Sequence, residues 1–117
     1  MRNFRDLEVW KDARKLVKTI YELIEVLPKS ENFGLKSQIS RCVISIPANI
    51  AEGCAKDSQK DFVRFLQISM GSAFELETHL IICSDLSYFE LDDDLLAEIH
   101  KLQKRINALI KYSKTNY

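Results

Sequence analysis

Apolar residues recur every three or four positions in four separate segments of this 117-residue chain. That spacing places them along one side of an α-helix, which completes a turn about every 3.6 residues. The segments run over residues 6–27, 32–54, 58 to between 85 and 87, and from 92 almost to the end. The stripe of the last segment is Leu95, Ile99, Leu102, Ile106 and Leu109. Since only short loops separate the segments, the sequence predicts an all-α fold, a single antiparallel up-down-up-down four-helix bundle over residues 1–117.

Composition supports long helices and narrows the possible locations of the protein. The chain has only 3 Gly and 2 Pro, fewer than the many turns of a sheet protein usually need. Its 17 basic residues balance 17 acidic ones, so its total charge excludes a strongly basic nucleic-acid-binding protein. The first residues carry no apolar run typical of a secretory signal, and no uncharged stretch approaches the roughly 20 residues that span a bilayer. Cys42, Cys54 and Cys83 are odd in number and match no metal-ligand spacing. We therefore expect reduced thiols in a cytoplasmic protein.

Pro47 lies inside the second predicted helix, in the stretch that ends at Gly53. A proline there removes one backbone hydrogen bond and presses on the carbonyl of Val43, so we expect a kink or a local break. The amide of Asn49 or a nearby hydroxyl is a candidate partner for that carbonyl. Gly53 is expected to stop the helix.

Charged residues lie on both sides of this proline. Arg41 and, from the third predicted helix, Arg64 are candidate ion-pair partners for Glu52. The stretch either fixes how the helices pack or forms a polar cluster at a subunit or ligand surface, and the sequence leaves both interpretations open.

A search for catalytic or metal-binding patterns finds none that is complete. His79 and Cys83 are four residues apart and can share a helix face, but two ligands do not make a structural zinc site. A set of Glu75, His79 and Cys83 lacks a loop that forms an oxyanion hole. Glu75 and Glu77 point about 200° apart on a helix, so they form no acid/base pair. We predict no enzymatic activity and no catalytic, cofactor-binding or metal-binding residues.

Basic residues gather on the first and last predicted helices, although the chain as a whole is neutral. They form two lines, Lys11, Arg14, Lys15 and Lys18 on the first helix, and Lys101, Lys104, Arg105 and Lys111 on the last. Those two helices are neighbours in a bundle of this topology, so the lines are candidates for one surface that binds nucleic-acid phosphates. Ordinary solvated helix faces are the alternative. No interleaved aromatic residues indicate base stacking, so binding would be to the backbone.

Four stretches of the chain resemble one known protein family. They are FRDLEVW at residues 4–10, FGL at 33–35, SIPANIAEG at 45–53 and GSAFELET at 71–78. Together they are similar to the four-helix-bundle proteins encoded in intervening sequences of bacterial 23S ribosomal-RNA genes, and the resemblance covers residues 4 to about 112. The residues assigned to the family motif are Arg41, Ser45, Pro47, Asn49, Glu52 and Gly53.

The resemblance implies a small bundle that assembles as a pentameric ring and has no established enzymatic site. A distant relative, the accessory protein of diversity-generating retroelements, binds nucleic acid and a reverse transcriptase through basic surfaces of its ring. The motifs do not include the two basic lines, so nucleic-acid binding by this chain follows from analogy alone.

Three functional hypotheses follow. The first is a non-enzymatic, self-assembling homo-oligomer whose basic surface binds RNA or single-stranded DNA; Trp10 is its main interface candidate, because large exposed aromatic residues favour interfaces. Its further candidate contacts are Phe4, Leu7 and Tyr21. The second is a protein-interaction module that partners a nucleic-acid enzyme, such as a reverse transcriptase, without binding nucleic acid itself. The third is an enzyme or metal protein built around His79, Cys83 and the residues near Pro47.

Overall fold

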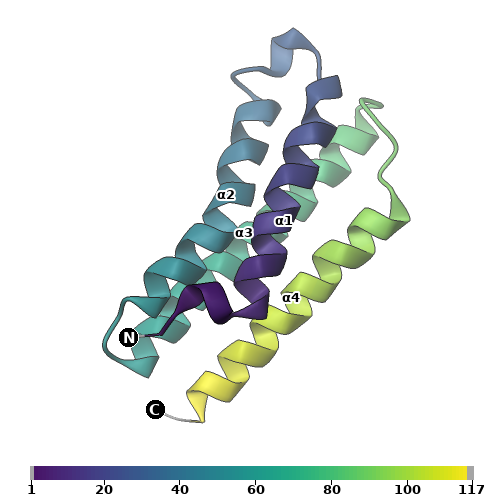
Figure 1. Ribbon diagram of the computed structural model, residues 1–117. Coiled ribbons are helices and arrows are strands. Elements are labelled where there is room, and N and C mark those ends of the chain that lie inside the picture. The colour runs from purple at the N-terminus through teal and green to yellow at the C-terminus, as the bar shows by residue number, and fades with distance from the viewer. Residues whose placement is uncertain (1, 116–117) are drawn as a thin grey trace.

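The computed structural model describes residues 2–115 and shows four long helices in an antiparallel bundle (Figure 1). Helix α1 spans Glu8–Leu23, α2 Leu35–Cys54, α3 Gln59–Asp85 and α4 Asp93–Lys114. Three short 3-10 helices precede α1 or join it to α2, namely η1 (Phe4–Asp6), η2 (Ile24–Val26) and η3 (Lys29–Glu31). The bundle is a rod of 45 × 25 × 19 Å. The predicted all-α four-helix fold is confirmed.

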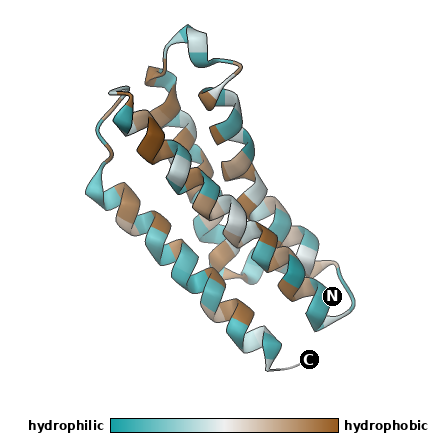
Figure 2. Ribbon diagram, turned by 180° about the vertical axis from the view of Figure 1, so that it is seen from behind, coloured by the Kyte–Doolittle hydropathy of each residue, from teal (hydrophilic) through white to brown (hydrophobic). Residues whose placement is uncertain are grey.

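One hydrophobic core runs the length of the rod and receives side chains from all four helices. Figure 2 shows hydrophobic and hydrophilic residues alternating along each helix, as amphipathic helices require. A fully buried member from each helix in turn is Ile20, Ile46, Leu76 and Ile106. The predicted stripe of α4 was wrong at its last position, because Ile110 is buried there and Leu109 only partly so.

The connection between α1 and α2 is less helical than predicted. The chain leaves α1 at Leu23, and α2 begins only at Leu35. One oxygen of the Glu31 carboxylate accepts a hydrogen bond from the backbone N–H of Leu35 at 3.2 Å, and the other accepts one from the Tyr88 hydroxyl at 2.8 Å. Glu31 therefore caps the start of α2 and ties it to the segment after α3.

Helix α2 is continuous through Pro47, so of the predicted kink or local break the break does not occur. The helix ends at Cys54, as predicted, where the N–H of Ala55 bonds to the carbonyls of Glu52 and Gly53. Gly53 has no positive φ, so it is not a left-handed cap.

Helix α3 ends in a Schellman motif with Ser87 in the left-handed conformation, at a φ of 63°. The N–H of Ser87 bonds to the carbonyl of Ser84 at 2.9 Å, and that of Tyr88 bonds to Cys83 at 3.0 Å. This position favours glycine, because a Cβ disfavours positive φ.

Ser87→Gly is expected to raise the free energy of unfolding by about 0.5–1 kcal/mol, the relief of strain less the added chain entropy of glycine. Urea denaturation followed by circular dichroism measures the change. Ser84→Gly is the matched control, since Ser84 lies within α3, and it should lower stability by a similar amount. Equal effects of the two glycines would contradict the assignment of strain to Ser87.

Candidate nucleic-acid interface

The two basic lines lie side by side, as predicted, because α1 and α4 are neighbours in the bundle. All eight basic residues of the lines are exposed. Arg105 of α4 forms an ion pair with Asp12 of α1, and Lys15 and Lys101 line the same groove between the two helices. The groove has a volume of about 220 Å³. Lysines from both helices therefore border one concave strip of surface.

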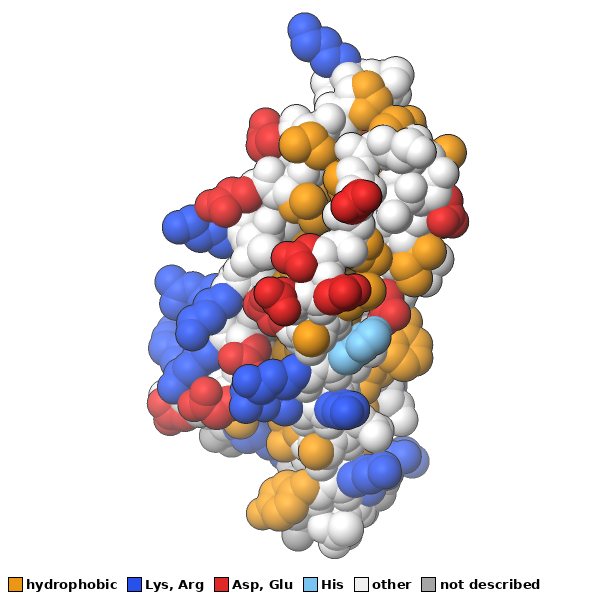
Figure 3. All heavy atoms as spheres, turned by 90° about the vertical axis from the view of Figure 1, so that its right-hand side faces the viewer, with side chains coloured by type: hydrophobic (Ala, Val, Ile, Leu, Met, Phe, Trp, Pro, Cys, Tyr) orange, Lys and Arg blue, Asp and Glu red, His pale blue; other side chains and the backbone are white. Residues whose placement is uncertain are grey.

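Acidic residues neutralise part of this surface. Asp12 takes up the charge of Arg105, and Glu8 lies 3.4 Å from Lys11. Glu98 lines the groove beside Lys101. Within residues 2–115, five lysines of the lines have no ion-pair partner; they are Lys15, Lys18, Lys101, Lys104 and Lys111. Figure 3 shows this face with basic side chains gathered at its left and lower centre, and acidic ones mainly above and between them.

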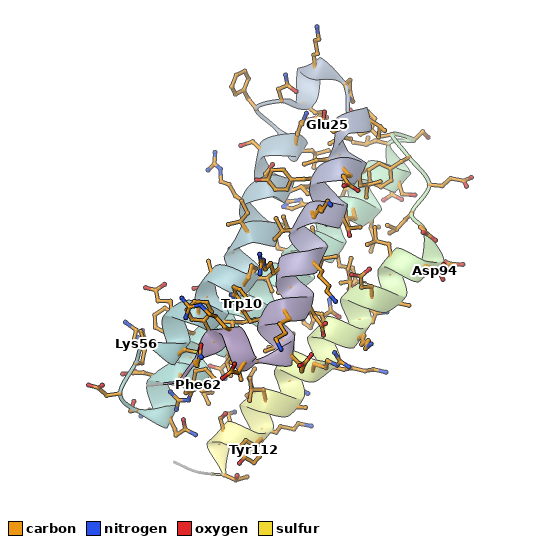
Figure 4. All side chains as sticks on the ribbon, in the orientation of Figure 1. Trp10, Glu25, Lys56, Phe62, Asp94 and Tyr112 are labelled. Atoms are coloured by element: carbon orange, nitrogen blue, oxygen red, sulfur yellow. The ribbon has the colours of Figure 1, made fainter. Side chains whose placement is uncertain are left out.

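Trp10 lies at the edge of the core rather than free on the surface. Its ring packs against the core and against the ring of Phe4, at a centroid distance of 5.0 Å (Figure 4). The guanidinium of Arg14 lies 5.5 Å from the Trp10 ring centroid, a cation–π arrangement. Leu7 is also half-buried, whereas Tyr21 is 40% exposed. The role of Trp10 in subunit contacts stays a prediction.

The residues of the SIPANIAEG stretch form a polar seam between α2 and α3. The hydroxyls of Ser45 and Ser72 bond to each other across the two helices. The hydroxyl of Ser69, which is fully buried, donates to the backbone carbonyl of Ile46 at 2.9 Å. These bonds satisfy polar groups inside the bundle, so this seam fixes how α2 packs on α3.

The predicted partners of this stretch were wrong in detail. The amide of Asn49 donates to the carbonyl of Ser45 at 2.8 Å, and not to that of Val43. No hydrogen bond or ion pair to Glu52 from Arg41 or Arg64 occurs in the described part of the chain. The reason is helix geometry: Arg41 reaches one turn back to Ser37, and Arg64 one turn back to Asp61.

Gly53 allows a close approach of α2 and α3. A Cβ atom at this position would lie 2.9 Å from the Cβ of Phe65, 3.2 Å from the Phe62 ring and 3.3 Å from the Phe62 carbonyl oxygen. Such contacts are too short for a methyl group. The glycine is therefore required by packing, which no local sequence signal indicated.

The two glutamates of α3 face different neighbours, as their spacing predicted. Glu77 accepts hydrogen bonds from Gln103 at 2.9 Å and pairs with the His100 ring at 3.0 Å, both on α4. These bonds lower the pKa of the Glu77 carboxyl. Glu75 instead lies 3.3 Å from the ring of His79 on its own helix.

The sequence suggested that His79 and Cys83 share a helix face, but the structure groups His79 with two other residues. His79 lies with Glu75 beside Cys42 of α2, and one candidate ligand atom from each residue falls within 4.8 Å of the others. Cys83 is fully buried elsewhere in the core. Sequence spacing could not reveal this grouping, because Cys42 comes from another helix.

The profile of the 23S rRNA-intervening sequence protein family matches residues 5–108, nearly the whole chain. The chain belongs to this family. A comparison with curated proteins finds no match. The description of the 23S rRNA-intervening sequence proteins names where they are encoded and no activity. Within residues 2–115, no helix is long and apolar enough to cross a membrane.

Proposed function

We propose that this 23S rRNA-intervening sequence protein is a non-enzymatic, self-assembling bundle that binds the phosphate backbone of RNA or single-stranded DNA through its α1–α4 face. The observation that carries the proposal is the groove bordered by Lys15 of one helix and Lys101 of the other. Lysines without acidic partners attract phosphates and release their counterions, and that attraction does not depend on base sequence.

Self-assembly is supported by the opposite side of the rod. Five of the large apolar side chains that remain exposed lie on α2 and α3, the helices that do not carry the basic lines. They are Ile44, Ile68, Phe74, Ile81 and Ile82, with exposures of 38–57%. Exposed apolar side chains on neighbouring helices favour contacts between copies. A ring built through α2 and α3 would leave the α1–α4 basic faces open to a polymer.

The affinity for a labelled single-stranded RNA, measured by fluorescence anisotropy, is expected to fall steeply with salt. If about five phosphates are contacted, the loss between about 50 and 200 mM salt is roughly 100-fold. Lys15→Glu with Lys101→Glu should weaken binding at least tenfold at low salt, because two attractions become repulsions. A DNA strand of the same sequence distinguishes RNA recognition from backbone binding.

The matched control is Lys29→Glu with Lys60→Glu, which changes the net charge equally at exposed lysines outside the two lines. It should retain most of the affinity. Equal losses in the two double variants, or no RNA binding at low salt, would contradict the proposed surface.

The mass in solution tests assembly: a particle of only 13.6 kDa at every concentration would contradict self-assembly. Assembly without RNA binding would favour the protein-interaction module.

A further inference from the structure

Cys42, Glu75 and His79 bring three metal-ligating groups together at the boundary between α2 and α3. One ligand atom from each residue, the Cys42 sulfur, a carboxylate oxygen of Glu75 and a ring nitrogen of His79, lies within 4.8 Å of the other two. Nothing in the basic surface or the serine seam uses these side chains. The three residues are called the C-E-H cluster below.

One nitrogen of the His79 ring has no hydrogen-bond partner in the described part of the chain. Its Nε2 lies 3.3 Å from the Glu75 carboxylate, whereas its Nδ1 is buried and has no hydrogen-bond partner in the described structure. A neutral imidazole that donates from Nε2 to a carboxylate carries its free lone pair on Nδ1. Buried polar atoms are rarely left without a partner, so this lone pair is available to a ligand.

The position of Cys42 explains what kind of ligand fits. Its side chain is buried at 5% exposure, and its sulfur donates a weak hydrogen bond to the Ile39 carbonyl at 3.5 Å. Burial, with a smaller contribution from the Glu75 carboxylate, raises the pKa of the Cys42 thiol to about 12. The free thiol is therefore unreactive at neutral pH, but a bound divalent cation deprotonates a coordinating thiol outright.

The cluster has nearly the dimensions of a tetrahedral site. With zinc–ligand bonds of about 2.0–2.3 Å, neighbouring ligand atoms lie about 3.3–3.8 Å apart. The 3.3 Å contact of the Glu75 oxygen is to Nε2 of His79 and not to Nδ1, so Glu75 has to leave this hydrogen bond to join a cation held by Nδ1. The ligand atoms lie within 4.8 Å of one another, so they close by at most about 1.5 Å to reach this spacing. The Glu75 side chain is 57% exposed and can rotate to make that adjustment.

We propose that Cys42, Glu75 and His79 bind zinc or a similar thiophilic divalent cation, with solvent as the fourth ligand. A thiolate and an imidazole favour this class of metal, whereas Mg²⁺ and Ca²⁺ prefer sites made only of oxygen atoms. The ion joins α2 to α3 at the edge of the hydrophobic core, to which Cys42 belongs, and coordinates the lone pair of His79. This assignment replaces the expectation from sequence that the chain holds no metal-binding residues, and it is independent of nucleic-acid binding.

The site is tested on the full chain, first stripped of metal with a chelator that is then dialysed away. Titration with Co²⁺ should produce a thiolate-to-cobalt charge-transfer band and the visible bands of a tetrahedral ion, saturating at one ion per chain. Zn²⁺ should displace the cobalt and raise the melting temperature. Because the thiol proton must leave, affinity should increase as pH rises through the neutral range.

Matched variants separate the cluster from adventitious binding. Cys42→Ala should abolish the charge-transfer band, and His79→Gln should weaken binding at least tenfold. Cys54→Ala removes another buried cysteine, and His100→Gln removes the only other histidine; both should bind as the parent does. Circular dichroism checks that each variant is folded. No tetrahedral cobalt spectrum in the parent, or cobalt binding that survives both Cys42→Ala and His79→Gln, overturns the proposal.

Discussion

Gly53→Ala is expected to lower the free energy of unfolding by about 1–3 kcal/mol, the usual penalty for forcing an extra methyl group into a packed interior. The new Cβ would meet the Phe65 Cβ at 2.9 Å and the Phe62 carbonyl at 3.3 Å. Neither atom is the free end of a flexible side chain, so α2 and α3 must move apart. The gain in helix propensity from glycine to alanine, about 1 kcal/mol, only partly offsets this strain.

Gly71→Ala is the control that isolates packing from propensity. Gly71 also lies inside a helix, but a Cβ there meets no atom within 4 Å. It should therefore stabilise the protein by about 0.5–1 kcal/mol. Both changes are measured by urea denaturation at the same protein concentration. If both alanines stabilise the protein, the close approach of α2 and α3 at Gly53 is not a constraint in solution.

The helices and most of the core could be predicted from the sequence, because apolar spacing directly encodes which face of a helix is buried. Four of the five residues in the predicted stripe of α4 are buried, namely Leu95, Ile99, Leu102 and Ile106. The α1–α2 connection could not be predicted in detail. Its geometry depends on Glu31, which bonds to Tyr88, a residue 57 positions later. Such contacts leave no periodic signal.

The candidate site, like the fold, could be predicted from the sequence only in part. Topology alone placed the two basic lines on neighbouring helices. The ion pair of Arg105 with Asp12 was missed, because the register of α1 against α4 is set by everything between them. The C-E-H cluster was missed for the same reason: a search along one helix pairs His79 with Cys83, whereas packing brings Cys42 to it from α2. A site built from side chains of two helices can be recognised only when the register of one helix against the other is known.

Phe62→Ala is expected to have the largest effect of any substitution considered, a loss of about 3–5 kcal/mol. The ring is 1% exposed, lies beside Gly53, and has the Arg2 guanidinium 4.0 Å from its centroid (Figure 4). Its removal leaves a cavity where the last turn of α2 meets the first turn of α3, and the Gly53 backbone cannot fill it. A small domain is stable by only about 5–15 kcal/mol, so this variant approaches or crosses the threshold of folding.

The matched control for Phe62→Ala is Phe74→Ala, on the same helix but 57% exposed. Its truncation should change the stability of a single subunit by less than about 1 kcal/mol, since most of the ring already contacts water. Urea denaturation and mass in solution are measured together for both variants. A loss of assembly with subunit stability retained would place Phe74 in a subunit contact. A loss of stability with Phe74→Ala as large as with Phe62→Ala would contradict the core described for the single bundle.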